Sequence, residues 1–254
     1  MKKIILTLAA LAICSTATLA QENKFSVGMG VGTTNHFYQG DEITFPTPFF
    51  DVRYDNFFIT GANIGYDVYN EDSVTLSLFV NPFDGFPIKA SKMDHDYDSI
   101  DERKTQIALG AIAAYDLPAY DMTALVALSG GERGVKGEAR LVKPYSLSSD
   151  FTLIPSISAN FYSEDYTDYY FGIDGDELGG KINHTYSPSN AYSLGISLAA
   201  EYYLTDKITL LAFLSADKFS SEIGDSPIID NSTLLKMELC LDHTKSISLT
   251  VFYT

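Results

Sequence analysis

The stretch "AYSLGISLAAEYYL", residues 191–204, carries an apolar or aromatic side chain at every second position. The alternating residues are Tyr192, Leu194, Ile196, Leu198, Ala200, Tyr202 and Leu204. A period of two places all of them on one face of a β-strand. The stretch is long for a strand of a globular domain, but it suits a strand that crosses a bilayer at a tilt. It therefore predicts a transmembrane β-strand.

The same alternation recurs along the chain, while helical periodicity is nearly absent. "KFSVGMGVG" (24–32), "DSVTLSLFV" (72–80) and "TQIALGAIAAY" (105–115) are clear cases. The predicted strands lie near residues 24–32, 47–54, 57–68, 73–80, 85–91, 105–115, 120–129, 134–143, 151–162, 191–204, 207–218 and 233–241. We therefore expect an all-β, antiparallel transmembrane β-barrel of about 12 strands, formed as a single domain by residues 21–254.

Connection lengths support this strand count. In outer-membrane barrels the periplasmic turns are short, the extracellular loops are longer, and both chain ends are periplasmic. The short connections "DN", "NPFDG", "DLPA", "PYSLSSD" and "TD" then all fall on the periplasmic side. The long connections 33–46, 92–104, 163–190 and 219–232 all fall outside. The predicted location is the outer membrane of a Gram-negative cell.

Residues 1–20 resemble a cleaved signal peptide, with Lys2 and Lys3 ahead of an apolar run and a small residue, Ala20, before the expected cleavage site. Cys14 raises a lipoprotein alternative, but Ile13 is bulkier than the small residue expected before a lipidated cysteine. The chain has 17 Lys and Arg against 33 Asp and Glu, a formal charge of −16. This balance argues against nucleic acid as a partner. The outer-membrane lipid and lipopolysaccharide are the expected surroundings.

Charged residues stand on the strand faces opposite the apolar ones. The predicted lumen-facing charges are Asp51, Arg53, Lys136, Glu138, Arg140, Glu201, Lys236 and Glu238. The same charges facing lipid would cost about 2–4 kcal/mol for each Arg or Lys at mid-depth. Two interpretations stay open: paired ions that pack a rigid interior, or a pore lined by selective charges. Acidic outer loops would favour cations at such a pore and could hold divalent ions against lipopolysaccharide.

The sequence gives little support to an enzyme or to a cofactor. Asp174, Asp176 and Glu177 in "DGDE" are weak metal candidates, because the spacing of a calcium loop is incomplete. Ser226 in "GDSP" lacks the partner motif of a Gly-Asp-Ser hydrolase, and the segment suits a turn, in which Asp225 would cap backbone amides. No catalytic residue, bound metal or cofactor is therefore predicted.

The stretch "FYSEDYTDYYFGID", residues 161–174, combines aromatic and acidic side chains. Phe161 and Tyr162 are expected to end a membrane strand. The later aromatics, Tyr166, Tyr169, Tyr170 and Phe171, are expected in an aromatic girdle or at the base of the longest outer loop.

Five stretches resemble the MipA/OmpV family of outer-membrane proteins, named for the MltA-interacting protein. They are "KFSVGMGVG", "FPTPFFDVRYDNFFITGANIGYDVY", "DERKTQIALGA", "DYTDYYFGID" and "SSEIGDSPIID", in family order. The most specific motif residues are Tyr169, Tyr170, Phe171, Gly172, Asp225, Ser226 and Pro227. The resemblance implies an outer-membrane barrel. For the founding member it implies a scaffold between a lytic murein transglycosylase and a penicillin-binding murein synthase.

One departure concerns the C-terminal end. Family members end in an aromatic-terminated strand, whereas here the strand that ends at Leu241 is followed by "DHTKSISLTVFYT". This strand-like extension, residues 242–254, either supplies the terminal aromatic signal or forms a thirteenth segment. The predicted function is a structural or scaffolding barrel linked to murein-synthesising or murein-remodelling enzymes. The alternatives are a porin-like channel for small solutes or cations, and a soluble periplasmic β binding module.

Overall fold

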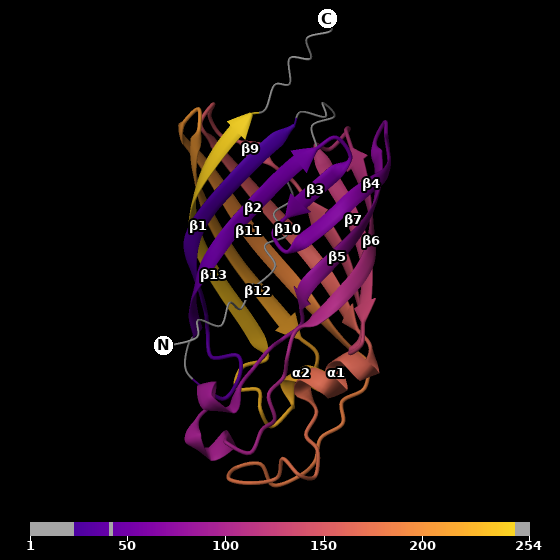
Figure 1. Cartoon of the computed structure of the whole chain (residues 1–254), viewed down its shortest axis with the longest axis vertical. Coiled ribbons are helices and arrows are strands. Elements are labelled where there is room, and N and C mark those ends of the chain that lie inside the picture. Colours follow the sequence, from indigo (N-terminus) through magenta and orange to yellow (C-terminus); the bar gives the residue numbers. More distant parts are fainter. Residues whose placement is uncertain (1–22, 41–42, 247–254) are drawn as a thin grey trace, which may run out of the picture.

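The computed structural model describes residues 23–40 and 43–246, which form a closed antiparallel β-barrel (Figure 1). The strands are β1 (Lys24–Thr34), β2 (Ile43–Tyr54), β3 (Phe57–Thr60), β4 (Asn63–Glu71), β5 (Val74–Asp84), β6 (Gln106–Leu117), β7 (Met122–Gly131), β8 (Gly134–Val142), β9 (Tyr145–Ser146), β10 (Phe151–Tyr162), β11 (Ala191–Thr205), β12 (Ile208–Phe219) and β13 (Thr233–Ser246). Each strand pairs with its neighbours in sequence, and β1 pairs with β13 to close the ring. The short β9 continues β8 along β10, so the wall has twelve strands.

The two ends of the barrel differ. At the upper end in Figure 1, β-turns of a few residues join β2 to β3, β4 to β5, β6 to β7 and β11 to β12, and β13 ends there. At the lower end lie residues 35–40 and the long connections 85–105, 163–190 and 220–232. The short connection of β9 to β10 also lies at the upper end. This agrees with the predicted separation except for "NPFDG" (81–85), which was expected at the periplasmic end but lies at the end of β5 next to the long connection 85–105. The barrel rule then makes the upper end periplasmic.

The strand count was predicted correctly, but two strand assignments were wrong. Residues 57–68 are not one strand: the chain reverses at Gly61, whose φ of 58° suits glycine, and β3 and β4 pair as a hairpin. Residues 85–91 are not a strand either. Ile88 makes one isolated bridge with Arg103, and the segment "NPFDG" belongs partly to β5. The two errors compensated, which is why the total agreed.

The final strand is longer than predicted. β13 runs past Leu241 to Ser246, and its register with β1 continues to the pair Lys24 and Ser246. Residues 242–246 of the extension therefore belong to the twelfth strand and form no separate segment. Residues 247–254 and the expected signal peptide lie outside the described residues.

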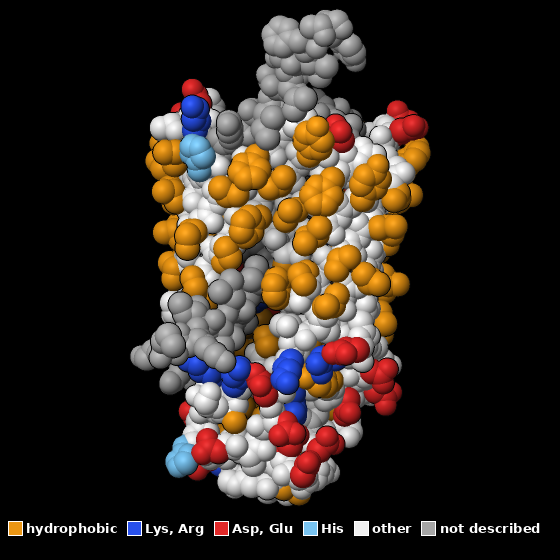
Figure 2. All heavy atoms as spheres, viewed as in Figure 1, with side chains coloured by type: hydrophobic (Ala, Val, Ile, Leu, Met, Phe, Trp, Pro, Cys, Tyr) orange, Lys and Arg blue, Asp and Glu red, His pale blue; other side chains and the backbone are white. Residues whose placement is uncertain are grey.

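Apolar side chains cover the outside of the wall. On β11, for example, Tyr192, Leu194 and Ile196 are each at least 60% exposed, while Ser193 between them is buried. Figure 2 shows hydrophobic side chains spread over the barrel wall and charged ones gathered below it, around the long connections. This is the distribution that a barrel surrounded by lipid requires.

Short helices occur only in the long connections of the described chain. They are α1 (Glu164–Phe171), α2 (Ser221–Gly224) and the 3-10 turns η1 (Ala90–Lys92) and η2 (His95–Tyr97). None of the helices in residues 23–40 and 43–246 is long and apolar enough to cross a bilayer.

Candidate functional site: a luminal cavity beneath an aromatic cap

The long connections fold back and pack into one apolar core at the end of the barrel, which we call the aromatic cap. Its buried members are Phe37, Tyr38, Ile88, Met93, Tyr97, Ile100, Tyr162, Tyr166, Tyr170, Phe171, Ile173, Ile182, Ala191, Phe219, Ile223, Ile228, Ile229 and Leu234. Helix α1 contributes Tyr166, Tyr170 and Phe171, all with no exposed surface. The rings of Tyr166 and Tyr170 lie 4.8 Å apart, and that of Phe86 lies 5.3 Å from Phe171.

The predicted position of these aromatics is therefore half right. They lie at the base of the longest outer loop, but Tyr166, Tyr170 and Phe171 do not form a girdle at the membrane surface. Sequence alternation could not distinguish the two positions, because "EDYTDYYF" is helical and turns its aromatics inward. Tyr169 is the partly buried member, and the Arg133 guanidinium lies 3.9 Å above its ring.

The two most specific family motifs meet within the aromatic cap. The Ser226 hydroxyl is buried and donates a hydrogen bond of 2.6 Å to the carbonyl oxygen of Phe171. Gly172 follows as the C-cap of α1, and its N–H donates to the Asp168 carbonyl. Ser226 lies with Asp225 and Pro227 in the turn after α2. Its hydroxyl thus holds two loops together.

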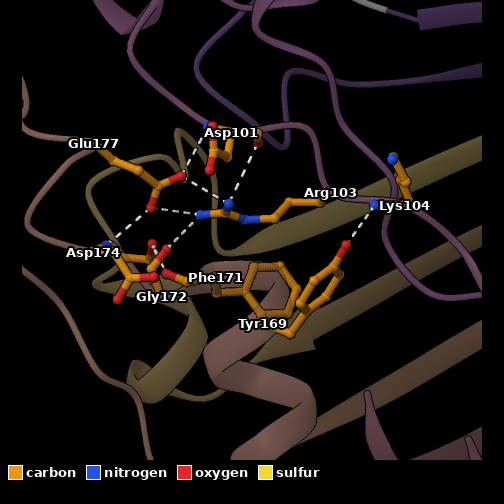
Figure 3. A network of polar contacts seen from close by, with 9 residues as sticks. Asp101, Arg103, Lys104, Tyr169, Phe171, Gly172, Asp174 and Glu177 are labelled. Atoms are coloured by element: carbon orange, nitrogen blue, oxygen red, sulfur yellow. Dashed lines mark hydrogen bonds and ion pairs between the residues drawn. The ribbon is translucent and has the colours of Figure 1, made fainter. Parts of the chain in front are cut away.

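A buried ion pair fastens the rim of the aromatic cap (Figure 3). Arg103 Nη1 lies 2.7 Å from Glu177 Oε1, and Nη2 lies 2.9 Å from Oε2. Arg103 also donates to the carbonyl of Gly172, while the N–H groups of Asp101 and Asp174 donate to the Glu177 carboxylate. A bidentate pair with further hydrogen bonds is the geometry in which a buried charge is best compensated.

This network gives Glu177 of the "DGDE" segment a structural role. Burial acts to raise the pKa of Glu177, but the Arg103 guanidinium and the two backbone N–H groups outweigh it and lower the pKa. Asp174 contributes its N–H to this site, and Asp176 is exposed. In the part of the chain that the structure describes, no three His, Cys, Asp or Glu side chains are grouped as metal ligands.

Buried tyrosines of the aromatic cap have their hydroxyls directed at backbone oxygens. Tyr38 donates to the Phe86 carbonyl at 3.0 Å and Tyr170 to the Lys104 carbonyl at 3.0 Å. Burial is the main cause that raises the pKa of Tyr38, Tyr166 and Tyr170 well above the usual tyrosine value. These hydroxyls therefore stay neutral. Those of Tyr38 and Tyr170 act as hydrogen-bond donors, whereas the buried Tyr166 hydroxyl has no hydrogen-bond partner among the described residues.

A cavity of about 310 Å³ lies in the lumen, on the side of the aromatic cap that faces the inside of the barrel. Both aromatic and charged side chains line it. The aromatic lining residues are Phe37, Tyr38, Phe45, Phe79, Phe83, Phe86, Tyr162, Tyr166 and Phe219; the charged ones are Asp84, Lys92, Lys136, Glu138, Arg140, Asp217 and Lys236. Pockets of about 300–1,000 Å³ with this mixed lining are typical of small-ligand sites.

Four of the eight predicted lumen-facing charges line this cavity, namely Lys136, Glu138, Arg140 and Lys236. Arg140 Nε lies 2.5 Å from Glu138 Oε1, and Lys136 pairs with Asp84. Lys236 lines the cavity together with Asp217.

The other four lie nearer the short-turn end. Asp51 pairs with Lys24 at 2.7 Å, and Arg53 pairs with Asp67 at 2.5 Å. Glu201 and Glu238 border a separate space of about 10 Å³, where Glu201 accepts a hydrogen bond from the Tyr203 hydroxyl. Of the described residues, neither Arg53 nor Glu201 lines the larger cavity that Arg140 lines.

The partners Lys24, Asp67, Asp84 and Asp217 were missed at the sequence level. Alternation gave a usable signal for one of them: Tyr66 and Val68 are exposed to lipid, so Asp67 between them must point inward. Asp84 stood in the segment that was misassigned as a turn. Asp217 and Lys24 lay on predicted strands, but nothing in the pattern marked their pairing.

Comparison with known proteins agrees with this architecture. A family model described as "MltA-interacting protein MipA" matches residues 27–243. The chain is 35% identical to a 24 kDa outer membrane protein of Pasteurella multocida, over 83% of this chain and 86% of that protein. It is 27% identical to the MltA-interacting protein of Escherichia coli, over 90% and 93%.

Among solved structures, the translocator domain of the autotransporter NalP from Neisseria meningitidis is similar at a TM-score of 0.46 and 10% identity, covering 87% of this chain and 88% of that one. The family and the closed barrel place the protein in the outer membrane, and they overturn the alternative of a soluble periplasmic module. The chain belongs to the MltA-interacting protein MipA family.

Proposed function

We propose that this barrel is a scaffold of the cell envelope that binds a murein-remodelling enzyme at its periplasmic end, and that it is not an open pore. The observation that carries this proposal is the aromatic cap. Tyr166, Tyr170 and Phe171 fill the outer end of the lumen with side chains that have no exposed surface. Such a packed end favours a rigid body over a wide water path.

The periplasmic end supports the same proposal through its charge. Each of its five short connections carries an exposed aspartate: Asp55, Asp72, Asp121, Asp150 and Asp206. We call these five the acidic rim. A ring of like charges steers partners that carry a complementary basic surface. A relative is named for its interaction with MltA, so a murein transglycosylase is the first partner to test, with a penicillin-binding synthase as the second.

The experiment is capture of murein enzymes from detergent extracts of cell envelopes on the immobilised barrel. We expect capture by the wild type and a loss of capture when all five acidic-rim residues are changed to Asn. The matched control changes five exposed acids at the opposite end to Asn: Asp94, Asp98, Asp165, Asp176 and Asp230. A wild-type barrel that retains no murein enzyme would overturn the scaffold.

The alternative is a narrow channel for small solutes or cations. It is supported by the charged lining of the luminal cavity, in which Lys136, Arg140 and Lys236 lie near Asp84, Glu138 and Asp217. Single-channel recording in a planar bilayer separates the two functions. The scaffold predicts no steady conductance, whereas a stable cation-selective conductance would favour the channel.

A further inference from the structure

The wall of the barrel is incomplete beside the luminal cavity. Because β3 has four residues, it pairs with β2 only from Asp51 to Tyr54. Among the described residues, 43–49 of β2 therefore have a strand partner on the β1 side alone. On the facing edge, the pairing of β5 with β4 starts at Val80. Beyond it, Asp84 pairs with Gln106 of β6, whereas Pro82 and Phe83 lie in a register irregularity and have no strand partner within the described chain. We call this strip, below the hairpin of β3 and β4, the wall gap (Figure 1).

The sequence is adapted to these two unpaired edges by proline. The Gly61 N–H donates to the Phe50 carbonyl, so the even-numbered residues at this part of β2 direct their backbone groups away from β1. Pro46 and Pro48 follow the same parity and face the wall gap. Pro82 stands on β5 two residues beyond Val80, the last residue that pairs with β4, and lies in the register irregularity between Asn81 and Asp84. Proline has no N–H, and in sheets it is confined to edges and bulges.

Prolines at these positions lower the energetic cost of leaving a strand edge unpaired in lipid. An unpaired N–H in hydrocarbon costs several kcal/mol, which is why open strand edges are absent from lipid-exposed walls. Removing donors from both edges lets the strands remain apart at a lower cost. The alternating prolines in "FPTPF" (45–49) thus indicate that the edges are built to stay unpaired.

The luminal cavity reaches this strip. Its lining includes Phe45 on one edge, Phe83 on the other, and Asn63 at the start of β4 above them. Phe45 is 6% exposed, whereas Phe83 is 41% exposed and lines the cavity as well. Phe50 and Val80, which border the strip from above, are exposed apolar residues of the lipid-facing surface. The cavity therefore meets the apolar band of the wall.

The lining of the cavity indicates the kind of molecule that it would take. Aromatic rings stand at the strip, with Phe45, Phe79 and Phe83 contributed by β2 and β5. The rest of the lining carries charges of both signs, four bases and three acids: Lys92, Lys136, Arg140, Lys236, Asp84, Glu138 and Asp217. An apolar entrance and an interior with charges of both signs are complementary to a single-chain lipid with a zwitterionic head.

We infer that the wall gap is a lateral opening through which a single-chain zwitterionic lipid enters the luminal cavity from the outer half of the bilayer. The opening lies on the long-loop side of the wall, which is the outer side by the barrel rule. The aromatic cap blocks access to the cavity along the barrel axis. Among the described residues, the wall gap is therefore the remaining way for an amphiphile to reach the cavity.

The test is photo-crosslinking of the barrel in phosphatidylcholine vesicles, with a lysophosphatidylcholine that carries a diazirine on its chain. Adducts are mapped by mass spectrometry. We expect adducts on Phe45 and Phe79, which are buried, as well as on exposed Phe83. A two-chain phosphatidylcholine with the same diazirine should label exposed wall residues such as Leu128 and Ile157, but not Phe45 or Phe79.

Two variants make the result decisive. Ala127 lines the cavity, so A127F should fill it and abolish the adducts on Phe45 and Phe79 while those on Leu128 remain. Ala111 faces lipid on β6, so A111F should leave every adduct in place. Heat-modifiable gel migration checks that each variant folds. Lysolipid adducts confined to exposed wall residues in the folded wild type would overturn the lateral opening, as would buried adducts that persist in A127F.

Discussion

The two ends of this barrel are held together by different kinds of contact. At the long-loop end, side chains from segments far apart in sequence share one buried core, as the contact of Phe37 with Phe219 illustrates. At the short-turn end, the turns contact adjacent strands through the backbone, as when the Asp116 N–H donates to the Ser73 carbonyl. There Asp55, Asp72 and Asp121 lie in the left-handed region at φ near 50°. A local defect in a cooperative core destabilises all residues of that core, whereas a defect in one turn mainly destabilises that turn.

Deleting a central ring of the aromatic cap should have the largest effect. Phe171→Ala removes a fully buried ring that lies within 6.4 Å of Phe37, Tyr38, Phe86 and Tyr170. We expect the free energy of cap opening to fall by about 3–5 kcal/mol. Trypsin cleavage after the exposed residues Lys92, Lys104 and Lys181 should accelerate accordingly, while the wall keeps its heat-modifiable migration.

The matched change at the other end is Tyr120→Ala. Tyr120 is 63% exposed in the turn between β6 and β7. Its loss should change stability by no more than about 0.5 kcal/mol. Equal acceleration of cleavage in both variants would mean that the two ends are not energetically distinct.

Breaking the buried ion pair should come next in size. Arg103→Met leaves the Glu177 carboxylate, which is 3% exposed, without its counter-charge. The expected loss is about 3 kcal/mol of cap stability, at the lower end of the range for an orphaned buried charge. The double variant R103M/E177Q removes the orphaned charge and should recover part of that loss. A double variant no more stable than R103M would assign the cost to packing of the arginine stem.

The pH dependence of the aromatic cap should follow from the same pair. The pKa of Glu177 is lowered from 4.5 in the folded chain, so its carboxylate stabilises the cap at pH values above 4.5. That contribution is lost as the pH falls through the lowered value. Near-ultraviolet circular dichroism of the cap tyrosines should report loosening in this acid range. E177Q should remove this component, and an unchanged acid transition in E177Q would place its origin elsewhere.

The difference between the ends also explains what the sequence could predict. Period-two alternation is a local property, so "AYSLGISLAAEYYL" and ten other predicted segments matched strands of the barrel, with 57–68 covering both β3 and the start of β4. It failed at "GFPIKAS" (85–91), where Phe86 and Ile88 alternate because they pack into the aromatic cap. The turn at Gly61 was missed because its residues continue an apolar run. Arg103 and Glu177 are 74 residues apart, and no periodicity joins positions at that distance.

The smallest effect should come from a turn at the periplasmic end. Asp72 holds a φ of 53° between β4 and β5, a conformation that glycine adopts without strain. Asp72→Gly should change the urea midpoint of the barrel in detergent by an amount equivalent to less than about 0.5 kcal/mol, because relief of strain and gain of unfolded-chain entropy oppose each other.

Asp72→Ala is the sharper partner of that variant. Alanine keeps the Cβ but lacks the polar side chain that helps Asp tolerate this region, so we expect a cost of about 1 kcal/mol. Because this turn contacts the backbone of the adjacent β6 and lies at the opposite end from the aromatic cap, this cost should lower the urea midpoint and leave trypsin cleavage after Lys104 and Lys181 unchanged. If Asp72→Ala accelerated cleavage of the aromatic cap, the strands would transmit strain along the whole wall. The stabilities of the two ends would then not be independent.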